Sequence, residues 1–67
     1  MKHIKLSKQE YLTLVGIRLG KSNVEIANML DVNRKTSSTY KYRIKEKLNV
    51  VEDVQLLIKA KELNLIS

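Results

Sequence analysis

The pattern of apolar positions and helix-capping residues predicts four helices and no strand. The expected helices cover residues 8–19, 23–30, 34–48 and 52–63. The period-two alternation that is typical of a strand does not extend beyond the first six residues. No proline interrupts the chain, and there is no repeat, linker or low-complexity stretch. We therefore expect one compact, all-α, four-helix domain over residues 1–67.

Polar residues at the start of each expected helix fix its bounds. Ser7 and Ser22 each precede a glutamate by three positions, which is the spacing of a capping box. Asn33 can cap the helix over 34–48 in the same way. Because the first helix ends only a few residues before the second box, a tight corner is expected between helices one and two. The residues expected to end helices with a positive φ are Gly20, Asn49 and Asn64.

The first predicted helix carries more apolar positions than one buried face needs. Leu14 and Ile17 form the expected inward face, while Leu12, Val15 and Leu19 form a second stripe. Two interpretations stay open. Either the helix rolls so that all five side chains join one broad core, or the second stripe is exposed and contacts another protein.

The fourth predicted helix shows a similar doubling. One apolar stripe consists of Leu56, Ala60 and Leu63. The other consists of Val51, Val54 and Ile58, with Leu57 beside it. A monomer of this size can bury only one stripe well, and full burial of one valine or isoleucine contributes about 1.5–3 kcal/mol. Self-association through the second stripe is therefore expected.

The composition excludes several classes of protein. The chain has no cysteine and a single histidine, His3, which rules out a disulfide scaffold, thiolate metal sites and a histidine cluster. No apolar run reaches the roughly 18 residues of a membrane span, and no signal peptide opens the chain. No nucleophile and base have a plausible spacing for catalysis. We expect a cytoplasmic protein that is not an enzyme and that needs no cofactor, metal or membrane.

The net charge of +6 is unevenly distributed along the chain. Residues 33–48 hold six basic side chains and one acidic side chain, a net charge of +5 within 16 residues. Such a concentration is expected of an element that binds phosphates, and on charge alone it fits a solvated helix face equally well.

The helix over 34–48 has three kinds of surface when it is drawn on a helical wheel. A short helix precedes it after the turn Asp31-Val32-Asn33, which is helix-turn-helix spacing. Its inward face consists of Ser37, Tyr40, Ile44 and Leu48. The opposite face offers candidate contacts to DNA bases: Lys35, Ser38, Thr39 and Tyr42. The two flanks offer candidate phosphate contacts: Arg34, Thr36, Lys41, Arg43, Lys45 and Lys47. This order favours nucleic-acid binding over a merely solvated helix.

Several stretches of the sequence follow a known family pattern. They are Leu6-Ser7-Lys8-Gln9-Glu10, Gly20-Lys21-Ser22-Asn23-Val24-Glu25-Ile26-Ala27, Leu30, Lys35-Thr36, Ile44, Lys47-Leu48-Asn49-Val50 and Asn64-Leu65-Ile66. Together they resemble the LuxR/GerE-type helix-turn-helix domain over residues 6–66. The resemblance implies a four-helix DNA-binding domain that acts as a dimer through its fourth helix. Both a stand-alone GerE-like protein and the C-terminal domain of a response regulator are compatible with it.

The resemblance also assigns roles to individual residues. The family's base-reading positions fall on Ser38, Thr39 and Tyr42. Its phosphate contacts fall around Thr36, Arg43 and Lys47, with Ser22 and Asn23 at the start of the second helix. The dimer contacts are expected at Val51, Val54, Leu57, Ile58 and Lys61. The chain departs from the family at Ser37, where Val or Ile is usual, at Ser38, where Lys is usual, and at Tyr40, where His is common.

Two functions are therefore expected to compete. The first is a bacterial transcription regulator that binds duplex DNA as a homodimer, with residues 34–48 in the major groove. The second is a small interaction module that pairs with a larger transcription regulator as cofactor or antagonist. RNA polymerase is a further candidate partner of the chain. The contacts of the module would be Leu12, Val15 and Leu19, or the second stripe of the fourth helix. A promoter-reading domain of the sigma-factor kind shares the helix-turn-helix, but it does not need the segment 50–66.

Overall fold

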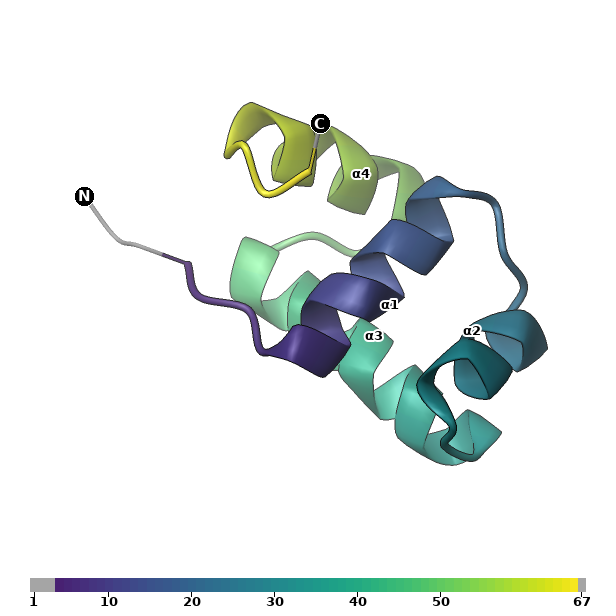
Figure 1. Cartoon of the computed structure of the whole chain (residues 1–67). Helices are drawn as coiled ribbons and strands as arrows, with labels where there is room; N and C mark the ends of the chain where they lie inside the picture. The colour runs from purple at the N-terminus through teal and green to yellow at the C-terminus, as the bar shows by residue number, and fades with distance from the viewer. Residues whose placement is uncertain (1–3, 67) are drawn as a thin grey trace.

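Four helices form the whole regular structure of residues 4–66, which are the residues that the computed structural model describes. They are α1 (Lys8–Arg18), α2 (Asn23–Leu30), α3 (Arg34–Leu48) and α4 (Asp53–Glu62), as Figure 1 shows. Each observed bound lies within one residue of the expected one. The all-α class is confirmed. The single histidine, His3, lies outside the described residues.

The starts of the first three helices are held by the expected caps. The Ser7 hydroxyl accepts a hydrogen bond from the Glu10 N–H at 3.2 Å, and the Glu10 carboxylate accepts one from the Ser7 N–H at 2.9 Å. Ser22 and Glu25 make the same pair of bonds at 3.2 and 2.8 Å. The Asn33 carboxamide oxygen caps α3. These bonds satisfy backbone N–H groups that have no partner inside the helix.

Left-handed residues end the helices, and one of them was not expected. Gly20, Asn49 and Asn64 have φ values of 77°, 57° and 59°, as predicted. Asp31 also has a positive φ, of 56°, and it terminates α2. Asp tolerates this conformation better than most residues because its short polar side chain can hydrogen-bond locally. The helix-turn-helix corner therefore depends on Asp31 as well as on the Asn33 cap.

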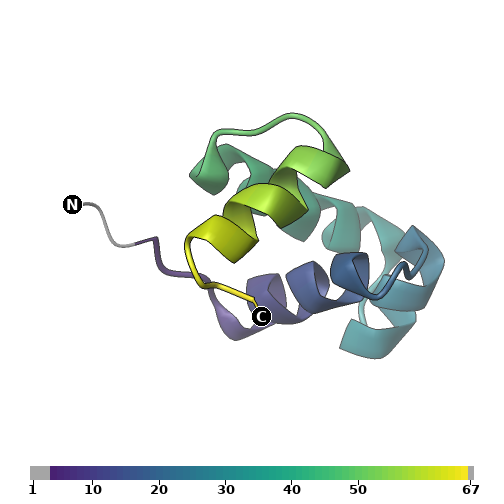
Figure 2. The same cartoon turned by 90° about the horizontal axis from the view of Figure 1, so that it is seen from above.

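The core lies where α1 and α3 cross. These two helices pack against each other and against both α2 and α4, whereas α2 and α4 do not touch each other within the described chain. Figure 2 shows α4 and the α3–α4 loop on one side of the molecule and α1 on the other. The buried cluster consists of Leu14, Ile17, Ile26, Leu30, Ile44, Leu48, Leu56 and Ala60.

Two small residues in this core allow close packing. An added Cβ at Gly16 would lie 2.8 Å from Cγ1 of Ile26, so α1 and α2 approach too closely for any larger residue without a shift. Ser37 is 3% exposed on the inward face of α3, and Tyr40 packs against the core beside it. The predicted inward face of α3 is confirmed, with Ser37 in a position that contributes little apolar area.

The second apolar stripe of α1 is unevenly exposed. Leu12 packs against the core and Val15 is half-buried, while Leu19 is 59% exposed. The three residues therefore differ in exposure, and only Leu19 is largely exposed. Leu12 contributes to the core because three helices pack against α1.

Candidate nucleic-acid interface

The outward face of α3 is a strip of four exposed polar residues, named the outer strip from here on: Lys35, Ser38, Thr39 and Tyr42. These are the four candidate base contacts, and the structure brings them together on one accessible face. Tyr42 is 65% exposed, and its hydroxyl lies 3.4 Å from the Glu46 carboxylate. The strip is therefore open to a large partner.

The hydroxyl groups of the outer strip differ in which hydrogen bonds they can still donate or accept. The Thr39 hydroxyl donates to the Lys35 carbonyl oxygen at 3.1 Å, so its hydrogen is used within the helix. Its oxygen can still accept a hydrogen bond from a base amino group. Ser38 is exposed and can donate or accept. The strip thus offers donors and acceptors side by side, as discrimination between bases requires.

The flank of α3 that faces α4 carries Lys41 and Lys45, and both are already paired. Their ammonium nitrogens lie 2.9 and 2.7 Å from the two carboxylate oxygens of Asp53, the first residue of α4. Lys41 also lies 3.4 Å from the Asn23 carboxamide oxygen at the start of α2. One lysine thus links three helices. The sequence prediction assigned these cations to phosphates and did not anticipate Asp53.

The opposite flank has an internal ion pair at its carboxyl end. The Lys47 ammonium donates to a Glu10 carboxylate oxygen at 2.6 Å and to the Lys5 carbonyl oxygen at 3.1 Å. Glu10 is only 3% exposed. Lys47 therefore ties the end of α3 to the start of α1, a structural role that the sequence prediction did not assign to it.

The pKa of the Glu10 carboxyl lies below its ordinary value. Burial raises the pKa, but this effect is outweighed by the Lys47 hydrogen bond and charge together with the N–H and hydroxyl groups of Ser7. The carboxylate is consequently ionised at neutral pH, and Lys47 is its charge partner. The capping box indicates a structural role for Glu10, but the sequence does not indicate its ion-pair partner Lys47, which lies 37 residues away.

Two arginines of α3 have no ion-pair partner within residues 4–66: Arg34 in the first turn and Arg43 in the third. Both are exposed, on opposite flanks of the outer strip. Ser22, Asn23 and Thr36, the other candidate phosphate contacts, lie at the amino ends of α2 and α3. Exposed guanidinium groups and helix amino ends both suit phosphate oxygens.

A second surface lies on α4 and the loop before it, named the α4 patch from here on: Val51, Val54 and Ile58. Their side chains are 76%, 68% and 55% exposed. Of the other expected dimer contacts, Lys61 is exposed beside the patch and Leu57 packs against the core. Leu56 and Ala60 are fully buried as expected, whereas Leu63 is 42% exposed and does not complete the inner stripe.

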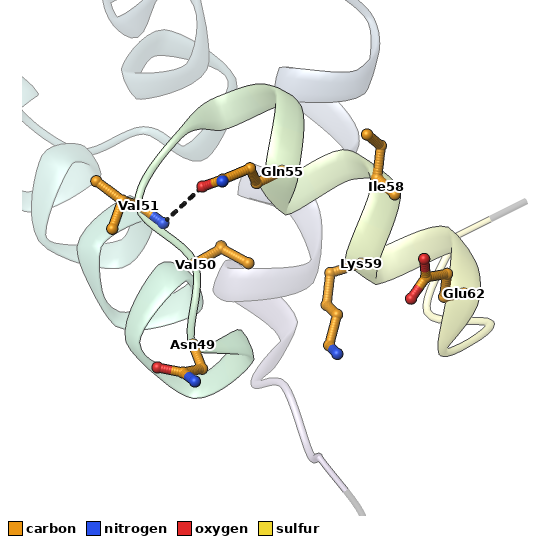
Figure 3. A pocket seen from close by; sticks show the side chains of 7 residues that line it. All are labelled: Asn49, Val50, Val51, Gln55, Ile58, Lys59 and Glu62. Atoms are coloured by element: carbon orange, nitrogen blue, oxygen red, sulfur yellow. Dashed lines mark hydrogen bonds between the residues drawn. The ribbon is translucent and has the colours of Figure 1, made fainter.

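A groove of about 330 Å³ runs beside the α4 patch (Figure 3). The Gln55 carboxamide oxygen shapes it by accepting hydrogen bonds from the N–H groups of Val51 and Glu52 at 3.2 and 3.0 Å. Its lining consists of Asn49, Val50, Val51, Gln55, Ile58, Lys59 and Glu62. A second groove of about 370 Å³ is lined by Tyr42, Lys45, Glu46, Val50 and Val51. Tyr42 of the outer strip and Val51 of the α4 patch therefore line the same groove.

Other kinds of site find no support in residues 4–66. No group of three or more His, Cys, Asp or Glu side chains there could hold a metal ion. None of the helices described is both long and apolar enough to traverse a bilayer.

Comparison with known proteins gives one consistent result. The model of the family described as bacterial regulatory proteins, luxR family, matches residues 5–60. Three relatives named "virulence factors putative positive transcription regulator BvgA" are each 42% identical to the chain over 60 residues; they come from Bordetella pertussis, Bordetella bronchiseptica and Bordetella parapertussis. The aligned region covers 90% of this chain but only 29% of each relative.

Proposed function

The chain belongs to the luxR family of bacterial regulatory proteins, and on that premise we propose that it binds duplex DNA as a homodimer to regulate transcription. The observation that carries this proposal is the outer strip, which stands exposed on the second helix of a helix-turn-helix. A protein with this function would act in the cytoplasm, where bacterial DNA lies.

In this proposal α3 lies in the major groove. Ser38, Thr39 and Tyr42 contact base edges, since an α-helix fits that groove and only there do all four base pairs differ in their donors and acceptors. Arg34 and Arg43 contact the phosphates on either side. The exposed amino end of α2 at Ser22 and Asn23 supports a further phosphate contact.

The α4 patch supports the second part of the proposal, the homodimer. Three large aliphatic side chains that are more than half exposed on so small a domain favour an interface. A twofold axis at α4 would repeat the same patch on both partners. The two copies of α3 would then read half-sites about 34 Å apart, one turn of B-DNA.

A random-sequence DNA selection on the chain tests the proposal most directly. We expect enrichment of a site with two inverted half-sites about one helical turn apart. Thr39→Ala and Tyr42→Phe should relax the preference at particular base pairs. Recovery of no preferred sequence would contradict base reading by the outer strip, and recovery of a single half-site would contradict the dimer.

Arg43→Gln tests a phosphate contact and serves as the counterpart to the base-contact variants Thr39→Ala and Tyr42→Phe. It should weaken binding to all sequences alike and lower the slope of log K against log salt by about one unit. Arg43 suits this test better than Lys47 because Lys47 neutralises Glu10 and its loss would also affect folding. If Thr39→Ala and Arg43→Gln changed the affinity for different DNA sequences in the same way, the outer strip and its flank would not have separate roles.

The α4 patch also favours a second candidate function, an interaction module that pairs with a larger regulator or with RNA polymerase. Of the two routes considered for such a module, only α4 keeps a continuous exposed apolar surface. Co-purification of a regulator that Ile58→Asn abolishes, together with no duplex shift at about 50 mM salt, would support this candidate over DNA binding, since phosphate contacts are strongest at low salt.

A further inference from the structure

Asp53 holds two of the cations that border the outer strip. Lys41 and Lys45 stand one turn apart on α3, and each binds a different oxygen of the same carboxylate, at 2.9 and 2.7 Å. The two lysine side chains are 22% and 23% exposed, while that of Asp53 is 45% exposed. The carboxylate is thus the most exposed member of this cluster, and both lysines remain partly accessible to an external anion.

A DNA phosphate presents the same chemistry to these lysines. Its two non-bridging oxygens share one negative charge, as the two carboxylate oxygens do, and each could accept from one ammonium group. Both lysines lie on the flank of α3 beside Ser38 and Tyr42, and Lys45 lines the same groove as Tyr42. A DNA backbone that runs along the outer strip would therefore approach Lys41 and Lys45, whose charges Asp53 already neutralises in part.

Two further features hold Asp53 in this position. It is the first residue of α4, where the helix amino end favours a negative charge. Hydrogen bonding to Lys45 lowers the pKa of its carboxyl, burial opposes this, and hydrogen bonding to Lys41 lowers the pKa further. Asp53 is therefore an ionised and anchored competitor at neutral pH.

We propose that Asp53 is a specificity-determining residue: it occupies Lys41 and Lys45 as an internal anion and so limits their use by the DNA backbone. This inference rests on the proposed DNA-binding function. With two flank cations occupied, binding depends more on Arg34, Arg43 and the outer strip, and less on sequence-independent contacts. Removal of the Asp53 charge should strengthen binding to random DNA more than binding to the selected site.

The test compares Asp53→Asn with Glu62→Gln in the full chain. Both remove one negative charge from the same helix, but Glu62 makes no ion pair with any described residue. Affinities for a random-sequence duplex and for the selected site are measured by fluorescence anisotropy over a salt series. Circular dichroism checks that each variant is folded, and Asp53→Ser replaces Asp53→Asn if the latter unfolds.

Asp53→Asn should steepen the salt dependence on random DNA by up to about two units, one for each lysine released. Its advantage over the parent protein should then shrink roughly tenfold between about 50 and 200 mM salt. Glu62→Gln should show a smaller gain and little change of slope. A slope and affinity for Asp53→Asn equal to those of Glu62→Gln would overturn the inference.

A double-mutant cycle separates release of the lysines from a general change of charge. In a Lys41→Gln/Lys45→Gln background, Asp53→Asn should improve binding to random DNA no more than Glu62→Gln does. Persistence of the full gain in that background would also overturn the inference. If neither the parent nor Asp53→Asn shifts any duplex at low salt, the proposed function itself fails. Sequence-preferring binding by the parent with no distinct Asp53→Asn effect removes only the inference.

Discussion

Helices α1 and α4 have similar sequences in three respects, yet the structure uses them differently. Each carries an inner apolar stripe, a second apolar stripe and a first-turn carboxylate that pairs with lysine on α3. In α1 the second stripe contributes Leu12 to the core. In α4 the second stripe leaves Val54 and Ile58 exposed.

The number of neighbouring helices accounts for this difference. α1 packs against all three other helices, so its apolar surface is covered on more than one side. α4 packs against α1 and α3 only, and its outer side faces away from both (Figure 2). An apolar stripe thus becomes core or surface according to what surrounds the helix, which a wheel of one helix does not show.

The two first-turn carboxylates differ in the same direction. The Glu10 side chain is 5% exposed and is enclosed by Lys47 and the Ser7 cap, whereas the Asp53 side chain is 45% exposed. A buried carboxylate that loses its partner is costly, while an exposed ion pair contributes little. Glu10 should therefore stabilise the fold, and Asp53 is available to affect binding.

The largest expected effects come from the inner stripes, where the two helices should behave alike. Leu14→Ala in α1 and Leu56→Ala in α4 each remove a side chain with no exposed area. Each should lower the free energy of unfolding by about 2–5 kcal/mol, because a cavity is left in the core. Urea unfolding followed by circular dichroism measures both. A much smaller loss for Leu56→Ala would mean that α4 docks independently of the core.

Substitution of the two first-turn carboxylates should affect stability differently in α1 and in α4. Glu10→Gln should lower the free energy of unfolding by about 1–3 kcal/mol, since it removes a charged hydrogen bond from a buried site. Asp53→Asn should cost at most about 1 kcal/mol because its pair is partly exposed. Glu62→Gln serves as the control and should stay within about 0.5 kcal/mol of the parent. The reverse order of the two losses would contradict the contrast in burial.

The second apolar stripes of α1 and α4 should also respond differently to substitution. Leu12→Asn should destabilise the domain by about 1–2 kcal/mol, because the side chain is partly buried against the core. Ile58→Asn should change the stability of the monomer by no more than about 0.5 kcal/mol. Sedimentation velocity should show that Ile58→Asn weakens self-association while Leu12→Asn does not. A dimer that survives Ile58→Asn unchanged would remove the α4 patch from the interface.

The smallest expected effect is on the dependence of stability on pH. The pKa of the Glu10 carboxyl is lowered on folding, from an ordinary value of 4.5. Its contribution to stability is therefore full above that pH and is lost as the pH falls through the lower value in the folded state. One such group adds at most about 1.4 kcal/mol per pH unit to the slope. Glu10→Gln should flatten the slope of the unfolding free energy against pH below pH 4.5.

Local signals in the sequence were sufficient for most of the fold. The capping boxes at Ser7 and Ser22 and the left-handed Asn49 act within a few residues, so helix bounds and corners follow from short-range chemistry. The inward face of α3 was predictable for the same reason, since one helical period determines which side chains share a face.

What the sequence could not supply was the pairing between distant elements. Lys41, Lys45 and Lys47 look alike on a wheel, yet two hold Asp53 and one holds Glu10. Which cations stay available for DNA depends on where α1 and α4 are placed by the core. The same limit explains why Leu12 was assigned to two opposite roles.

The bond from Lys47 to the Lys5 carbonyl oxygen determines where the polypeptide enters the domain. The segment before α1 runs alongside the last turn of α3, roughly 20 Å from its first turn. The curated relatives are longer than this chain. In a longer protein, a domain joined upstream of α1 would therefore lie near the carboxyl end of α3 and away from its first turn.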